Sequence, residues 1–118
     1  MITTTKTTQL AKKKCVPCEG GFPPLPEKKV KELLNEVEGW QREGKGISRE
    51  FKFKDFRAAQ QFLNKVADLA ESEGHHPDIH WSYNKVKLEL MTHAAGGLTE
   101  NDFIMAAKID KIKTLNQY

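Results

Sequence analysis

Residues 77–92 have the sequence PDIHWSYNKVKLELMT, in which apolar and polar side chains alternate. A period of two residues is typical of β-strands that cover a core with one face. The apolar positions on that face are Ile79, Trp81, Tyr83, Val86, Leu88 and Leu90. Asn84 and Lys85 lie between the two apolar sets, so we expect them to form the two-residue turn of a β-hairpin.

The position of this turn determines which residues face each other across the hairpin. With a loop at residues 84–85, counting outward places His76 directly opposite His93, with Cβ atoms about 4.5–5.5 Å apart. Both histidines then lie on the polar face of the hairpin. His75 precedes them and is expected at the same mouth, where Pro77 stiffens the backbone. The other residues of the polar face are Asp78, His80, Ser82, Lys87 and Glu89.

Four elements are expected before this hairpin. Apolar residues at helical spacing predict a helix from Pro26 to about residue 39. Residues 40–53 suggest two short strands around a glycine-rich turn. Asp55 is expected to cap a longer helix that ends at Gly74. The apolar face of that helix is Phe56, Ala59, Leu63, Val66 and Ala70.

A last helix is expected to begin at Thr99. Residues 99–102 have the sequence TEND, which resembles a capping box with Asp102 in place of the usual Glu. Core candidates in this helix are Phe103, Ala107 and Ile109. The expected order is therefore αββαββα. It predicts an α+β fold with a single four-stranded antiparallel sheet and helices packed on one face.

The composition favours one soluble domain. A chain of 118 residues can bury a modest core without disulfides or metals. The net charge of +3 is spread among alternating Lys and Glu, which argues against a nucleic-acid partner. No apolar run approaches the roughly 20 residues of a membrane span, and the start lacks a secretory apolar segment. We therefore expect no membrane partner and a cytoplasmic location.

Residues 1–24 are expected to be a flexible N-terminal arm before a domain at 25–118. The first 14 residues contain no acid, but the absence of Arg argues against a transit peptide. Cys15 and Cys18 have the spacing of a zinc knuckle or a redox pair. Neither a second ligand pair nor a following helix is evident, because glycines and prolines come next. The arm is therefore interpreted as carrying two thiols without an assigned role.

The histidines of the hairpin suggest acid-base chemistry. Imidazole titrates near neutral pH, so a cluster of histidines can hold one protonated and one neutral ring together. Proton transfer between such rings and a substrate requires no metal, nucleophile or redox cofactor. In one alternative the histidines are exposed polar residues with no task. In another, His75, His76, His80 and His93 bind zinc, copper or nickel. Nucleophilic catalysis is less favoured, because neither cysteine lies near them in the inferred hairpin.

Four motifs resemble the pterin-4a-carbinolamine dehydratase family: ESEGHHPD at 71–78, YNKV at 83–86, TH at 92–93 and GLTEND at 97–102. The resemblance extends from about Leu25 to the C-terminus. It implies the αββαββα fold and conversion of 4a-hydroxytetrahydropterin to quinonoid dihydropterin and water, in tetrahydrobiopterin recycling after aromatic amino-acid hydroxylation. It also implies a pterin substrate, no cofactor, and assembly into a homodimer or homotetramer.

The resemblance also implies the site residues. The family's catalytic histidines fall on His75, His76 and His93. The implied substrate-binding residues are Glu71, Pro77, Asp78, Thr92 and Asp102. Two of these have a structural alternative, Glu71 as a solvated helix-end charge and Asp102 as a helix cap. The chain departs from animal members at Ile79, where they carry Trp. A non-catalytic pterin-binding or assembly module is the alternative function, since it would use the same face.

Overall fold

The computed structural model describes residues 5–16 and 23–116. Its helices are α1 (Thr5–Lys12), α2 (Glu27–Leu34), α3 (Phe56–Glu73) and α4 (Glu100–Asn116). Its strands are β1 (Gln41–Glu43), β2 (Gly46–Lys52), β3 (Asp78–Ser82) and β4 (Lys85–Leu90), and a 3₁₀ turn, η1 (His93–Ala95), follows β4. The strands form one antiparallel sheet in the order β1-β2-β4-β3. The expected α+β class and αββαββα order are confirmed, with α1 as an addition.

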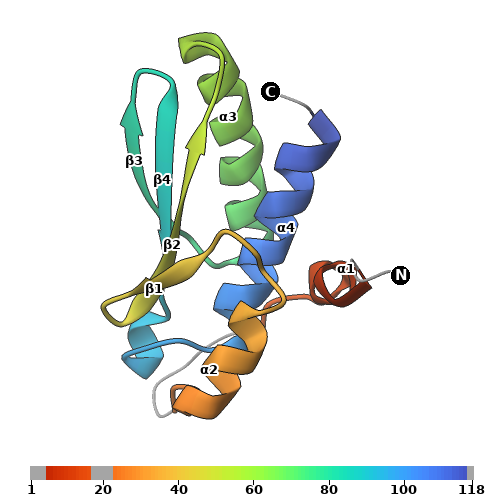
Figure 1. The fold of residues 1–118 in the computed structure, drawn as a ribbon, viewed down its shortest axis with the longest axis vertical. Coiled ribbons are helices and arrows are strands. Elements are labelled where there is room, and N and C mark those ends of the chain that lie inside the picture. Colours follow the sequence, from red (N-terminus) through yellow and green to blue (C-terminus); the bar gives the residue numbers. More distant parts are fainter. Residues whose placement is uncertain (1–4, 17–22, 117–118) are drawn as a thin grey trace.

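The core lies between the sheet and helices α3 and α4, which pack on one of its faces (Figure 1). Leu88 of β4, Phe62 of α3 and Phe103 of α4 are each 0% exposed. Full burial of such a side chain contributes roughly 1.5–3 kcal/mol to stability. The inward-facing residues of β4 are Val86, Leu88 and Leu90, as the alternation predicts.

The two ends of α3 are formed by the residues that the sequence indicates. The Asp55 side chain accepts a hydrogen bond of 2.8 Å from the Ala58 N–H and so caps the first turn. Gly74 ends the helix in the left-handed conformation, with φ of 68°, which a residue with a Cβ rarely adopts. This reversal directs the chain from α3 into β3 and places His75 and His76 at the junction.

The expected register of the β3–β4 hairpin is wrong. Ser82 pairs with Lys85, so the loop is Tyr83-Asn84 and not Asn84-Lys85. Asn84 is held by Phe53, the residue that follows β2: its side chain donates to the Phe53 carbonyl at 2.9 Å, and its carbonyl accepts from the Phe53 N–H at 2.8 Å. These bonds across the sheet favour the earlier turn, although Tyr83 then adopts a φ of 52°. Moving the loop by one residue shifts each partner by two, so the faces stay as expected.

The apolar face of β3 is more exposed than the alternation suggests. Strand β3 is at the edge of the sheet, and every one of its residues is exposed, with Ile79 at 44% and Trp81 at 38%. Phe56, expected in the core, is 49% exposed and stacks on Trp81 with ring centroids 4.4 Å apart. The helices cover β2 and β4, so this aromatic cluster lies outside the core.

Part of the N-terminal segment that we expected to be a flexible arm is helical. Residues 5–12 form helix α1, which lies against α4 (Figure 1). Leu10 is 2% exposed and belongs to the main core. The Lys108 ammonium group of α4 donates to the Ala11 carbonyl at 2.8 Å. One buried leucine and these polar contacts hold the segment, a combination that composition alone does not reveal.

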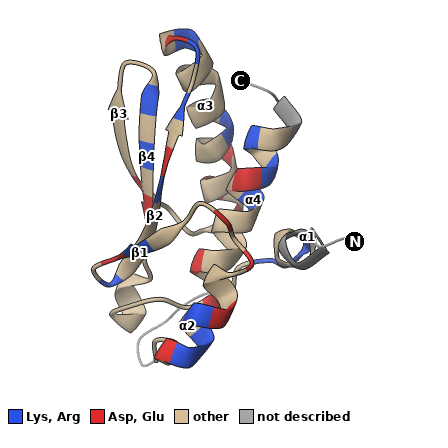
Figure 2. Cartoon of the chain, in the orientation of Figure 1, with Lys and Arg blue, Asp and Glu red and all other residues tan. Residues whose placement is uncertain are grey.

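The charged residues are mixed in sign along the helices. Figure 2 shows Lys and Arg interleaved with Asp and Glu on α2 and α4. Among the helices that the structure describes, none has the length and apolar character to cross a membrane.

Candidate active site

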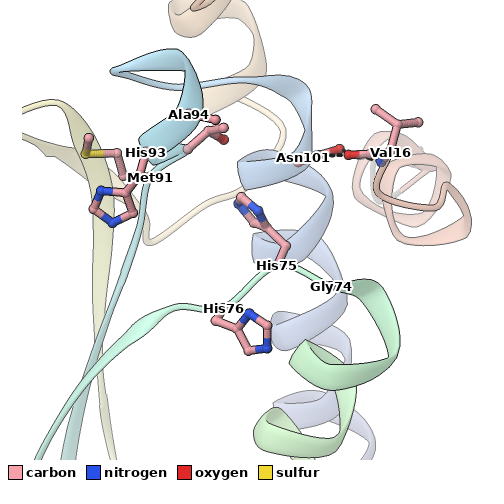
Figure 3. A pocket seen from close by; sticks show the side chains of 9 residues that line it. Val16, Gly74, His75, His76, Met91, His93, Ala94 and Asn101 are labelled. Carbon is pink, nitrogen blue, oxygen red and sulfur yellow. Dashed lines mark hydrogen bonds between the residues drawn. The ribbon is translucent and has the colours of Figure 1, made fainter. Parts of the chain in front are cut away.

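A cavity of about 260 Å³ lies where α3, β4 and α4 meet. Its lining residues are Val16, Gly74, His75, His76, Met91, Thr92, His93, Ala94 and Asn101. Figure 3 shows His75 at the centre of this group, with His93 and Met91 on one side and Asn101 and Val16 on the other. Three of the chain's four histidines therefore line one cavity.

His75 is the most enclosed of the three. Its Nε2 lies 2.6 Å from Oδ1 of Asp102, and the side chains of the two residues are 11% and 0% exposed. Because a carboxylate oxygen accepts, this contact places the proton of the ring on Nε2 and fixes the ring's orientation. His75 is therefore held in one position beside the cavity.

Asp102 is a centre of hydrogen bonds as well as the partner of His75. Its Oδ2 accepts from the Thr92 hydroxyl and from the Thr99 N–H, each at 2.9 Å. The second bond is the expected capping-box contact at the start of α4. The helix-cap interpretation of Asp102 therefore applies to Oδ2, while its other oxygen, Oδ1, contacts His75. Thr92 in turn ties the end of β4 to α4.

His76 is exposed and has a carboxylate partner of its own. Its Nε2 lies 2.7 Å from Oε2 of Glu71, and the side chains are 58% and 80% exposed. Glu71 lies in the last turn of α3, so the contact spans the Gly74 reversal. An exposed pair of this kind contributes little to stability. Its geometric effect is to hold the His76 ring at the edge of the cavity.

We expected His93 to lie opposite His76 on paired strands, but it does not. Strand β4 ends at Leu90, and Thr92 forms an isolated bridge with Gly97. His93 then begins the η1 turn and is exposed. Because of the register shift and the η1 turn, the two histidines are not cross-strand partners. Both still line the cavity with His75.

The remaining expected site residues lie elsewhere. Pro77 and Asp78 do not line the cavity, and Asp78 pairs with Glu89 inside the hairpin. His80, a candidate metal ligand, is on the open face of the sheet, 3.4 Å from Glu89. Within residues 5–16 and 23–116, no group of three or more His, Cys, Asp or Glu side chains has a geometry that could hold a metal ion.

Sequence reasoning missed several lining residues, chiefly Val16 and Asn101. Asn101 lies inside the TEND motif beside Asp102, so its position in a matched segment was a signal. Val16 had none, because it belongs to the segment interpreted as an arm. The neighbouring Cys15 is free, and burial and the nearby Glu73 carboxylate raise the pKa of its thiol to about 12. A protonated thiol is a poor nucleophile.

Comparison with known proteins identifies the family of the chain. The family model described as pterin 4 alpha carbinolamine dehydratase matches residues 23–112. A Nitrosospira multiformis protein named pterin-4-alpha-carbinolamine dehydratase is 48% identical over 108 residues, covering 92% of this chain and 96% of that protein. A Rubrobacter xylanophilus protein of the same name is 42% identical and covers 89% and 99% of the two chains.

A solved structure is similar to this chain in both fold and sequence. The crystal structure of a transcriptional coactivator/pterin dehydratase from Brucella melitensis superposes with a TM-score of 0.73 at 41% identity. The match covers 75% of this chain and 97% of that one. The family model alone spans well over half of the sequence, so the chain belongs to the pterin 4 alpha carbinolamine dehydratase family.

Proposed function

We propose that this chain is a hydro-lyase that converts a 4a-hydroxytetrahydropterin to the quinonoid dihydropterin and water, with His75, His76 and His93 as its catalytic residues. The observation that supports this most is that three imidazoles from separate segments line one cavity, and that two of them are paired with carboxylates. Family membership supports the same substrate class.

The reaction needs two proton movements and nothing else from the protein. The bond between C4a and the hydroxyl oxygen breaks, and a proton from the protein completes the leaving water. The hydrogen on the adjacent N5 passes to a base, and the electrons of the N–H bond form the new C4a–N5 double bond. Neutral and protonated imidazoles can do both, and no electron acceptor is required.

The geometry supports a division of roles. In the proposed mechanism His75 and His93 exchange protons with the hydroxyl and with N5, and His76 holds the pterin at the rim. Asp102 and Glu71 act as positioning residues, because their carboxylates bind histidine rings. The Thr92 hydroxyl is bound to Asp102, so it supports that carboxylate. Pro77 and Asp78 do not line the cavity, so the proposed pterin contacts exclude them.

The decisive test is a dehydration assay with 4a-hydroxytetrahydropterin generated by a hydroxylase in the same vessel. We expect the purified protein to accelerate formation of the quinonoid product well above the uncatalysed rate, and His75→Ala to remove most of this acceleration. Binding of the pterin without acceleration would instead identify a pterin-binding or carrier module. The assay, coupled to an aromatic amino-acid hydroxylase, also tests the proposed place in cofactor recycling.

We also propose that the chain self-associates as a homodimer or homotetramer. Strand β3 is an edge strand whose outer backbone groups have no neighbouring strand among the described residues. It carries the exposed apolar side chains Ile79 and Trp81. Unprotected edges of this kind favour pairing with another strand.

A further inference from the structure

The segment from Leu10 to Val16 is fixed against the two helix ends that build the active site. Leu10 is buried at 2% exposure, and Lys108 of α4 binds the Ala11 carbonyl at 2.8 Å. The Cys15 N–H donates to Oε1 of Glu73 at 2.8 Å. Glu73 is the last residue of α3, so the segment contacts both α4 and the reversal that leads to His75.

The contact at Glu73 is charge-assisted. Burial alone would raise the pKa of this carboxyl, but the Cys15 N–H bond and the nearby Lys108 ammonium together hold the pKa below its ordinary value. Nζ of Lys108 lies 3.5 Å from Oε2 of Glu73. Lys108 therefore joins Ala11 to Glu73, and Glu73 joins Lys108 to Cys15. Hydrogen bonds to charged groups are stronger than neutral ones.

Asn101 completes the attachment at the cavity itself. Its Oδ1 accepts from the Val16 N–H at 3.0 Å, and its Nδ2 donates to the Val16 carbonyl at 2.6 Å. Asn101 is 3% exposed, and a buried amide is costly unless both its donor and acceptor are satisfied. Both ends of this amide bind the backbone of one residue. The side chain thus acts as a two-point clamp on Val16.

The clamp places an apolar side chain at the rim of a polar site. Val16 is 53% exposed and lines the cavity together with the three histidines. Figure 3 shows it on the side of His75 away from Met91 and His93. Ligand sites combine apolar walls with a few directed polar groups, and a flat heterocycle needs contact on its faces or edges.

We propose that Val16, held by Asn101, is a substrate-binding wall of this site and sets the affinity for the fused ring system of the pterin. This inference rests on the proposed function and extends it to a residue outside the family match at 23–112. Val16 is then the residue of the N-terminal segment that belongs to the active site. Its contribution is to binding, because Val16 has no group that can transfer a proton.

The test is a comparison of kcat and KM for dehydration in Val16→Ser, Asn101→Ala and Lys13→Ala. Val16→Ser leaves the clamp intact because the clamp uses backbone atoms, so this variant folds even if Asn101→Ala does not. We expect KM to rise about 10-fold in Val16→Ser and Asn101→Ala, with kcat within about 3-fold of wild type. Lys13→Ala is the matched control: it removes an exposed ion pair with Glu100 at 2.7 Å from the same segment and should leave both constants unchanged.

A wild-type KM in Val16→Ser, with an active wild-type enzyme, overturns the inference and leaves the proposed function intact. If the wild type does not dehydrate the pterin, the proposed function fails and a binding measurement decides the inference. The probe is a tetrahydropterin that lacks the 4a-hydroxyl group, titrated by calorimetry. Equal dissociation constants for wild type and Val16→Ser, or no binding by the wild type, would then overturn it.

Discussion

At the scale of single residues, the pairing of His75 with Asp102 is the contact on which the proposed mechanism depends. Asp102 is fully buried and binds His75 through one oxygen, while the other oxygen caps α4 and binds Thr92. The oxygen on the capping side holds the first turn of α4, whereas in the proposed mechanism the oxygen on the His75 side orients the ring. The capping role and the ring-orienting role of Asp102 can therefore be separated by a substitution that keeps the size and shape of its side chain.

We expect Asp102→Asn to lower kcat by roughly 10²- to 10⁴-fold, the range that general acid-base groups contribute. Asn can keep its oxygen toward Thr99 and Thr92, which turns its NH₂ group toward His75 and reverses the hydrogen-bond direction at Nε2. Steady-state kinetics measure kcat of this variant, and its denaturant midpoint shows whether it remains folded. Glu71→Gln, at an exposed pair, is the control and should lose less activity. Turnover at the wild-type rate in Asp102→Asn would reject the positioning role.

A second residue-scale prediction concerns His76 and His93. Each single Ala variant should lower turnover by roughly 10- to 10⁴-fold, and the double variant should be much less impaired than the product of the two effects. The reason is that both rings line one cavity with His75, so removing either disables the same step. Both side chains are exposed, so unfolding free energies should change by less than about 0.5 kcal/mol. Strictly multiplicative losses would show that the two histidines act separately.

At the scale of elements, the sequence predicts the helices and strands well but not the details that depend on contacts between them. Asp55 and Gly74 define α3 because capping and the left-handed turn are local. The β3–β4 loop was misplaced by one residue because Asn84 is bound by Phe53, 31 residues earlier. The same limit applies to the site. The motifs bring together the three histidines that line the cavity. Their arrangement arises from η1 and from the reversal at Gly74, and not from cross-strand pairing.

The N-terminal segment illustrates the other limit. Its helix carries one buried apolar residue, Leu10, so hydrophobic periodicity is weak. The contacts that hold it come from residues 73, 101 and 108, which are distant in sequence. Short segments that dock by polar contacts with distant residues leave no local pattern to detect.

Helix α4 is joined to the sheet by a buried carboxylate that makes stability depend on pH. Asp110 is 15% exposed and accepts from Nε1 of Trp40 at 2.9 Å and from Arg49 at 2.8 Å. Burial raises the pKa of Asp110 from 3.8 to about 6, against the opposing effects of Trp40 and Arg49. A raised pKa means that the folded state favours the protonated form. The stabilisation is present below the unfolded pKa and is lost as pH rises through the folded one.

We therefore expect the wild-type free energy of unfolding to fall, relative to Asp110→Asn, as pH increases from 4 to 6.5. The relative loss is at most roughly 3 kcal/mol, because one pKa unit corresponds to about 1.4 kcal/mol. Urea denaturation of both proteins across this range gives the difference, in which other titrating groups cancel. Parallel curves for the two proteins would mean that Asp110 does not titrate in this window.

At the scale of the whole molecule, the sheet is covered asymmetrically. Helices α3 and α4 cover one face near β2 and β4, while β3 stands at the edge with all five residues exposed (Figure 1). The cavity lined by the three histidines is at the other end of the hairpin from the Tyr83-Asn84 loop, where α3, β4 and α4 converge. Assembly along β3 would therefore involve a surface separate from the residues that line the cavity.

The last prediction follows from this edge. We expect the protein to form a dimer or a larger homo-oligomer at micromolar concentration, because pairing of β3 with β3 of a second copy satisfies backbone groups and covers Ile79 and Trp81 in a symmetric contact. Ile79→Lys should shift the protein toward monomer, since a charge on the apolar face opposes its burial. His80→Lys adds a charge to the same strand on the opposite, polar face and should leave the assembly intact. Light scattering gives the masses, and circular dichroism checks that each variant remains folded. Two outcomes would contradict this prediction: a wild type that is monomeric at these concentrations, or an Ile79→Lys variant that assembles as the wild type does. Either would mean that the β3 edge does not drive assembly, and that the contact of Phe56 with Trp81 protects it sufficiently in solution.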